Sequence, residues 1–256
     1  MREPKLTLGN VLGHFRTINK HKLEVMKACL RAGLVWRGLV HDLSKYSPVE
    51  FLTSARYYQG GTFSPINAEK YYRGFSLAEQ HHHGHNSHHW EYWITGRMMG
   101  GVPIKVPLKV AVEMVCDFIA AGKIYEGKRW TPRSPYEHLK KNIENGICKF
   151  HPATEKLILR LQEEFMDNGF AALKAKNVRR VADDMGYDEI PSVDNPELLA
   201  VAKRVWDLAH GGIEKGGKEQ AVEKSEGEVL VRGQLGKGEV AEVGDGKEPV
   251  KKEIVK

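Results

Sequence analysis

A histidine and an aspartate stand side by side at His41 and Asp42, and six of the nine residues from 81 to 89 are histidines. Imidazole nitrogens combined with carboxylates suit first-row transition metals, whereas Mg and Ca prefer sites built mostly from oxygen. Several histidines that share an aspartate commonly hold one or two ions, which position a water molecule and lower its pKa. The sequence therefore predicts a site for one or two divalent ions of Mn, Fe, Co, Ni or Zn.

Two more candidate ligands lie outside these stretches. His21 follows His14 by two turns in a segment with helical periodicity, and Asp117 borders an apolar stripe in a segment otherwise short of charge. A carboxylate beside a buried stripe needs a partner, which a metal ion or a lysine would supply. The alternative is that Asp117 and Glu113, four residues apart, share a solvated helix face.

Helical periodicity dominates the elements that must position these residues. Val112, Val115, Cys116 and Ile119 should form the buried stripe of one helix. Within the histidine-rich stretch, Gly84 and Asn86 favour a turn over a continuous helix. The predicted helices span residues 7–31, 35–45, 68–80, 108–121, 135–145 and 151–166, with another starting at Ser47-Pro48, a helix-permissive stretch at 171–188 and a short helix within 191–210.

The composition sets limits on the class of protein. Of the 256 residues 41% are apolar, enough for a sizeable core, and the formal net charge of +6 permits anionic partners. Three cysteines without CxxC spacing suggest neither a disulfide framework nor a cysteine zinc site. Because neither a signal sequence nor a membrane span is recognisable, we expect a cytoplasmic protein with no membrane partner.

The composition changes after Gly211, where Gly, Glu, Lys and Val recur without aromatic residues. Such a segment cannot bury enough apolar surface to offset its ordering entropy. We therefore expect three parts: a helical metal-binding domain at 1–190, a C-terminal helix at 191–210 whose Trp206 packs on the domain, and a disordered tail at 211–256.

His21, His41-Asp42 and Asp117 follow one another in an order that resembles the HD superfamily of metal-dependent phosphohydrolases. The pattern of that superfamily is a histidine, a His-Asp doublet, optional further histidines and a distant aspartate. The doublet followed by Lys45 is similar to HD domains that hydrolyse phosphodiesters, and His82-His83 falls near the additional histidines. The resemblance implies an all-α, HD-domain-like helical bundle with a bound divalent metal.

The runs at residues 14–22, 38–48, 57–60, 88–93 and 119–121 look like an uncharacterised family of bacterial and phage proteins that carries only a domain-of-unknown-function label. The likeness covers about residues 14 to 170. His83 and His85 depart from the pattern of that family, and Phe118 replaces an expected arginine. The matching positions in the histidine-rich stretch are His81, His82, Asn86, His88 and His89.

These resemblances imply a phosphohydrolase acting on a small phosphate ester or a nucleotide. Lys45 would hold an anionic oxygen, and His88 or His89 would complete a second ion's shell or protonate the leaving oxygen. Two alternatives stay open: a di-iron oxygenase of the HD type, and a non-catalytic binding protein that the metal stabilises. The sequence does not give the oligomeric state. The expected metal ligands are His21, His41, Asp42, His82, His88 and Asp117, and the expected catalytic residues are Lys45, His88 and His89.

Overall fold

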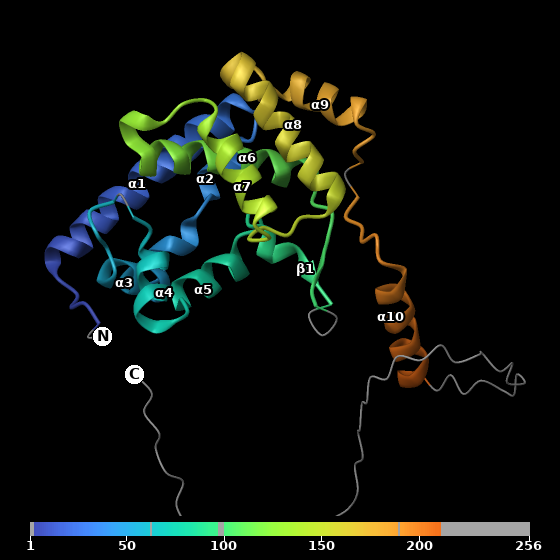
Figure 1. The fold of residues 1–256 in the computed structure, drawn as a ribbon, viewed down its shortest axis with the longest axis horizontal. Helices are drawn as coiled ribbons and strands as arrows, with labels where there is room; N and C mark the ends of the chain where they lie inside the picture. Colours follow the sequence, from blue (N-terminus) through green and yellow to red (C-terminus); the bar gives the residue numbers. More distant parts are fainter. Residues whose placement is uncertain (1–2, 62, 97–99, 189, 211–256) are drawn as a thin grey trace, which may run out of the picture. The chain divides into compact units, whose positions relative to one another are not determined.

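The computed structural model describes residues 3–61, 63–96, 100–188 and 190–210, and this part of the chain is all-α, as the sequence predicts (Figure 1). Short 3₁₀ segments lie at Leu43–Tyr46, Trp90–Trp93, Gly127–Arg129 and Gly169–Ala171. Two short strands, β1 (Ile94–Thr95) and β2 (Val102–Pro103), pair antiparallel. The helices are α1 (Leu8–Arg31), α2 (Val35–Val40), α3 (Pro48–Arg56), α4 (Pro65–Arg73), α5 (Leu77–His85), α6 (Leu108–Glu126), α7 (Ser134–Glu144), α8 (Pro152–Asn168), α9 (Ala175–Asp184) and α10 (Pro196–Ala209).

Helix α1 begins and ends where its sequence signals predict. The Oγ1 of Thr7 accepts a hydrogen bond from the backbone N–H of Asn10 at 3.1 Å, which satisfies a free amide of the first turn. At the other end Gly33 adopts a φ of 77°, so the chain can reverse directly into α2. The predicted start at Ser47-Pro48 is also confirmed, since Ser47 caps α3 and Pro48 is its first residue.

The core forms around α6, which lies between α1 and α8 (Figure 1). The predicted stripe of α6 is confirmed, because each of its four residues is at most 2% exposed. Leu157, Ile158 and Leu161 of α8 are fully buried against the same core. The burial of these apolar side chains fixes the face that α6 turns toward α1, and with it the direction of Glu113 and Asp117.

Three local predictions about the site-bearing segments were wrong. Helix α2 ends at Val40 and does not continue to Lys45, because the backbone leaves the helical region at His41. Gly74 adopts a left-handed conformation that ends α4, so residues 68–80 do not form one helix. The histidine-rich stretch does not begin as a turn, since α5 continues through Gly84 to His85 and Asn86 is its C-cap.

Trp206 contradicts the prediction that it packs on the domain. Its side chain is 64% exposed, and its ring stacks on His210 at a centroid distance of 3.8 Å within the same segment. The division between 1–190 and 191–210 stays a prediction, and the tail predicted at 211–256 lies outside the described residues. Among the described helices, none has the length and apolar character that crossing a bilayer would require.

Candidate metal centre

The backbone bends sharply at His41 and Asp42. After α2, His41 has a φ of −50° and ψ of 129°, and Asp42 adopts the left-handed conformation with a φ of 57°. Aspartate tolerates this conformation better than most residues, although it still costs energy. The bend directs both side chains inward, and both residues are only 2% exposed.

One group of candidate ligands forms where α1, α6 and this bend meet. The Nε2 of His21 lies 3.0 Å from Asp117 Oδ1 and 3.3 Å from Asp42 Oδ2. The Nε2 of His41 lies 3.3 Å from the same Asp42 oxygen and 3.5 Å from Asp117 Oδ1. Four residues from three separate parts of the sequence thus direct ligand atoms to one point.

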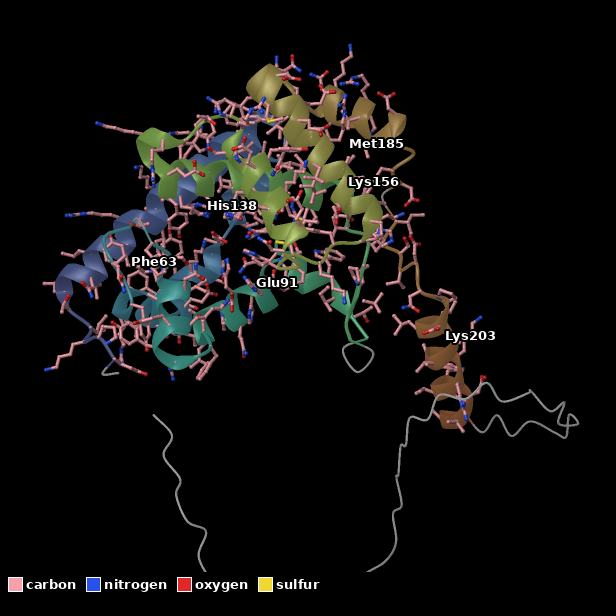
Figure 2. All side chains as sticks on the ribbon, viewed as in Figure 1. Phe63, Glu91, His138, Lys156, Met185 and Lys203 are labelled. Carbon is pink, nitrogen blue, oxygen red and sulfur yellow. The ribbon has the colours of Figure 1, made fainter. Side chains whose placement is uncertain are left out.

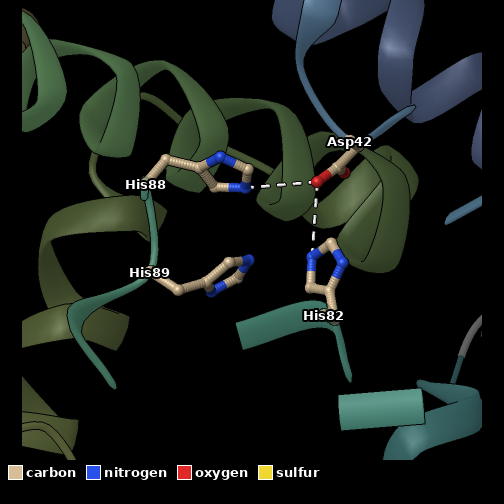
Figure 3. Close-up of side chains that lie close together, drawn as sticks. All are labelled: Asp42, His82, His88 and His89. Carbon is tan, nitrogen blue, oxygen red and sulfur yellow. Dashed lines mark ion pairs between the residues drawn. The ribbon is translucent and has the colours of Figure 1, made fainter. Parts of the chain in front are cut away.

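A second group forms on the other oxygen of Asp42 (Figure 3). Asp42 Oδ1 lies 3.3 Å from His82 Nε2 and 3.1 Å from His88 Nε2. His89 completes this group, and all its ligand atoms lie within 4.8 Å of one another. Asp42 therefore offers one oxygen to each group, as a carboxylate that bridges two ions would do.

The Nε2 atoms of these histidines, together with Asp42 Oδ1 and Asp117 Oδ1, are buried and make no hydrogen bonds, although several lie within ion-pair distance of one another. The other oxygen of Asp42 accepts a hydrogen bond from Lys45. Buried polar atoms in native proteins nearly always have bonding partners. A cluster of buried polar atoms without such partners therefore indicates that a bound partner, such as a metal ion, belongs among them. Atoms that surround an ion face the ion and not each other, which explains short distances without hydrogen-bond alignment. We call the residues involved the ligand cluster: His21, His41, Asp42, His82, His88, His89 and Asp117.

Two buried glutamates orient the histidines of the ligand cluster. Glu113 Oε1 lies 2.9 Å from His41 Nδ1 and 3.5 Å from His88 Nδ1, and its other oxygen pairs with Arg37. Glu50 lies 2.8 Å from His82 Nδ1. A carboxylate that accepts the Nδ1 proton leaves Nε2 free to bind a metal and makes it more basic.

The sequence did not identify either glutamate as part of the site. Glu113 was weighed only as a companion of Asp117 on a solvated face, and that alternative is wrong because Glu113 is 3% exposed. Its position one helical turn before Asp117 was the available signal. Glu50 gave no signal, because its partner lies 32 residues away on α5.

Electrostatics in the ligand cluster favour a positive charge between its carboxylates. Burial acts to raise the pKa of Asp42, yet the charges of Lys45 and His41 outweigh it and hold this pKa well below its usual range. Burial opposes ionisation of Asp117 too, but its contacts with His21 and His41 lower its pKa well below normal. Burial acts to lower the pKa of His41, and the charge of Asp42 reverses this and raises the pKa well above normal.

The second group favours neutral imidazoles. Burial lowers the pKa of His88 and lowers that of His89 well below its usual value, and the charges of neighbouring histidines act in the same direction. A neutral imidazole is the form that binds a metal ion. These two histidines are therefore suited to the role of ligand near neutral pH.

Lys45 is the cation nearest to the bridging carboxylate. Its Nζ lies 2.5 Å from Asp42 Oδ2. Burial acts to lower the pKa of Lys45, but the charges of Asp42 and Asp117 outweigh it and raise the pKa, so the ammonium stays charged. Lys45 lines a cavity of about 180 Å³ that also exposes His21, His82 and Asp117; we call it the cluster cavity.

The histidines that depart from the family pattern lie at the edge of the cluster. His83 Nδ1 lies 3.2 Å from Glu91 Oε1, and its ring stacks on His89 at 4.5 Å; Glu91 is labelled in Figure 2. Burial lowers the pKa of His83 to about 4. His85 is exposed and contacts the carbonyl of His81, and it belongs to none of the candidate ligand groups. His83, His89 and Glu91 also form a possible ligand group.

Residues 10–164, more than half of the chain, match the family described as "Family of unknown function (DUF5662)". The chain therefore belongs to this family, in agreement with the resemblance to a family of unknown function. Searches of the curated proteins and of the solved structures found no match. The matched range contains every residue of the ligand cluster together with Lys45, Glu50 and Glu113.

Proposed function

We propose that this member of the DUF5662 family is a metal-dependent phosphohydrolase that acts on a small phosphate ester or a nucleotide. The observation that carries the proposal is the bridging position of Asp42, which offers one oxygen to His21 and His41 and the other to His82 and His88. Paired sites that share a carboxylate are typical of enzymes that displace groups at phosphorus.

In this proposal His21, His41 and Asp117 would hold one divalent transition-metal ion, His82, His88 and His89 would hold a second, and Asp42 would offer an oxygen to each. Such ions would supply a water of lowered pKa and would stabilise negative charge on the phosphoryl oxygens. By their contacts with the Nδ1 atoms, Glu113 and Glu50 leave the Nε2 atoms of His41 and His82 free to bind the ions.

Lys45 is proposed to bind a phosphoryl oxygen. Its ammonium lines the cluster cavity together with Asp117 and His82, so an anion that enters this cavity meets the lysine and the proposed ions at once. The earlier assignment of His88 and His89 to proton transfer stays a prediction. Their lowered pKa values favour the role of neutral ligands over that of proton donors.

The HD resemblance supports the same reaction class by analogy. The histidine, the doublet and the distant aspartate come together in one cluster of an all-α protein, which is the arrangement the resemblance implies. Analogy of fold alone does not establish a reaction. The shared carboxylate of Asp42 and the adjoining Lys45 therefore support the proposed reaction more directly than the resemblance does.

The decisive experiment combines metal analysis with a screen of phosphate esters in the presence of Mn, Co, Ni or Zn. Wild type should bind up to two ions per chain and cleave at least one ester. A double variant with His41→Ala and Asp42→Ala should lose the metal and the activity, whereas His210→Ala, an exposed histidine directly after α10, should keep both. A full metal load in the double variant would disprove the site.

Lys45→Met separates metal binding from catalysis. Because Lys45 is not among the proposed ligands, this variant should retain its metal but lose most of the ester cleavage, by about a hundredfold or more. If the wild type contains iron and consumes oxygen without cleaving any ester, the oxygenase alternative replaces the proposal. If the metal raises the melting temperature but no turnover of either kind occurs, the non-catalytic alternative holds.

A further inference from the structure

A second cavity of about 410 Å³ adjoins the cluster cavity. Its walls come from α6, α7 and the chain at the start of α4; two of the lining residues, Phe63 and His138, are labelled in Figure 2. We call it the side cavity. The described residues that line it are Phe63, Ser64, Asn67, Phe118, Ala121, Gly122, Tyr125, Glu126, Ser134, Pro135, His138, Leu139, Asn142 and Cys148.

The two cavities share a wall on α6. Asp117, Ala121 and Tyr125, spaced four residues apart, line the cluster cavity, and Ala121 and Tyr125 line the side cavity as well. Ser64 is also common to both. A molecule with its phosphate in the cluster cavity would therefore extend its remaining part along α6 into the side cavity.

The chemistry of the side cavity differs from that of the cluster cavity. The rings of Phe63, Phe118 and Tyr125 offer flat apolar surface, and Asn67 and Asn142 offer amides. Among the described residues that line it there is no lysine or arginine, and Glu126 adds a negative charge. Additional phosphates would meet no lysine or arginine among these residues, whereas an uncharged ring could stack and form a few hydrogen bonds.

We propose that the side cavity binds the flat, uncharged ring of a phosphate monoester whose phosphate lies in the cluster cavity. Aryl phosphates and nucleoside monophosphates share this chemistry, while diphosphates and triphosphates are disfavoured. The inference rests on the proposed function for the placement of the phosphate. The side cavity itself can be tested without turnover.

The first test compares kcat/KM for phenyl phosphate, adenosine monophosphate, adenosine triphosphate and glycerol phosphate. The two monoesters with rings should be preferred over the other two. Phe118→Ala and Asn142→Ala should each reduce this preference about tenfold or less, without changing cleavage of glycerol phosphate to the same degree. The matched control is Tyr71→Ala, an exposed aromatic residue on α4 that lines neither cavity, which should leave the preference unchanged.

The second test uses Cys148, which lines the side cavity and is partly exposed, while Cys29 and Cys116 are buried. In the full-length chain treated with a chelator, phenyl phosphate should slow alkylation of Cys148 by N-ethylmaleimide, and glycerol phosphate at the same concentration should not. Phe118→Ala should remove the protection. Cys148→Ser identifies the labelled site by mass spectrometry.

The two tests distinguish the inference from the function. Ring-dependent protection of Cys148 without cleavage of any ester would retain the side cavity as a ring-binding site and reject the phosphohydrolase. Cleavage of all esters with equal efficiency, and no protection, would reject the ring-binding site and retain the phosphohydrolase. If no ester is cleaved and Cys148 is not protected, both the phosphohydrolase and the ring-binding site are rejected.

Discussion

At the scale of single residues, the candidate centre consists of two concentric sets of side chains. The inner set directs buried nitrogen and oxygen atoms to two points on either side of Asp42. The outer set, Glu113 and Glu50, contacts the Nδ1 atoms of His41 and His82, which face away from the two points. Neither glutamate is a proposed ligand. The contribution of the outer set to metal affinity can therefore be measured by substitutions that leave every proposed ligand in place.

Glu113→Gln should weaken metal binding by about 10–100-fold, because a neutral amide supports the Nδ1 proton of His41 less well than a carboxylate. Competition with a chromogenic chelator measures the affinity. The matched control is Glu69→Gln: Glu69 is equally buried, at 1% exposure, but it accepts hydrogen bonds from Ser76 and Arg73 and contacts no ligand. An equal loss of affinity in both variants would contradict the assigned role.

His14 provides a pH-dependent contribution to stability. Burial, followed by the charge of Lys45, lowers the pKa of His14 from 6.5 to about 4, and its ring packs on Phe51 and Tyr58. Because the unfolded chain takes up this proton first, stability is lost as the pH falls from 6.5 toward 4.

His14→Phe should remove this loss. Between pH 7 and pH 5, in the presence of a chelator, wild type should lose about 2 kcal/mol more unfolding free energy than the variant. Urea denaturation at the two pH values measures the difference. Equal losses in the two proteins would show that His14 is not held neutral by the fold.

At the scale of elements, the close contact of α1 with α2 positions the bend that carries His41 and Asp42. A Cβ at Gly38 would lie 2.8 Å from Cys29 Cβ and 3.4 Å from Met26 Cα of α1, so only glycine allows this approach. The position of the bend relative to His21 depends on this close approach of α2 to α1.

Gly38→Ala should therefore destabilise the metal-free protein by about 1–3 kcal/mol, because α2 must move away from α1. Gly84→Ala is the control: it lies in α5, a Cβ there meets nothing within 4 Å, and the change should stabilise the helix by about 0.5–1 kcal/mol. Thermal or urea unfolding measures both effects. Stability of Gly38→Ala equal to wild type would show that α1 and α2 can separate without cost.

Several predictions that rest on local sequence signals were confirmed, whereas features that depend on distant contacts were not predicted. Capping residues and apolar periodicity are local signals, and they located α1, α3 and the buried face of α6. The bend at His41 and the orientation of Glu50 depend on contacts across tens of residues, such as that between Glu50 and His82. No local signal reports such contacts. The residue types and their order therefore pointed to most of the side chains that come together in the ligand cluster, whose role as metal ligands stays a prediction, and only the structure identified the outer set.

At the scale of the whole molecule, the ligand cluster connects α1, the bend after α2, the end of α5 with the chain that follows it, and α6. An ion bound to these segments links parts of the chain that are up to 96 residues apart, as His21 and Asp117 are. Since the unfolded chain cannot present these ligands together, bound metal should stabilise the folded state.

Removal of metal should accordingly lower the melting temperature by roughly 5–10 °C for each ion present at about a hundredfold over its Kd. Differential scanning calorimetry with and without a chelator measures the shift. Asp42→Asn, which keeps the size of the side chain but weakens both groups, should show little response to the chelator. A chelator response as large as that of wild type would place the metal elsewhere.

The left-handed backbone of Asp42 limits how this protein can be stabilised. Asp42 is the one non-glycine residue in the described part of the chain with a positive φ, and it is also the residue shared by both ligand groups. Glycine would relieve the backbone strain at this position but would remove both oxygens of the bridge. Relief of the backbone and assembly of the centre therefore oppose each other at a single residue: an engineered glycine there should relax the bend, leave Lys45 and His41 without their carboxylate partner, and be unable to assemble the centre.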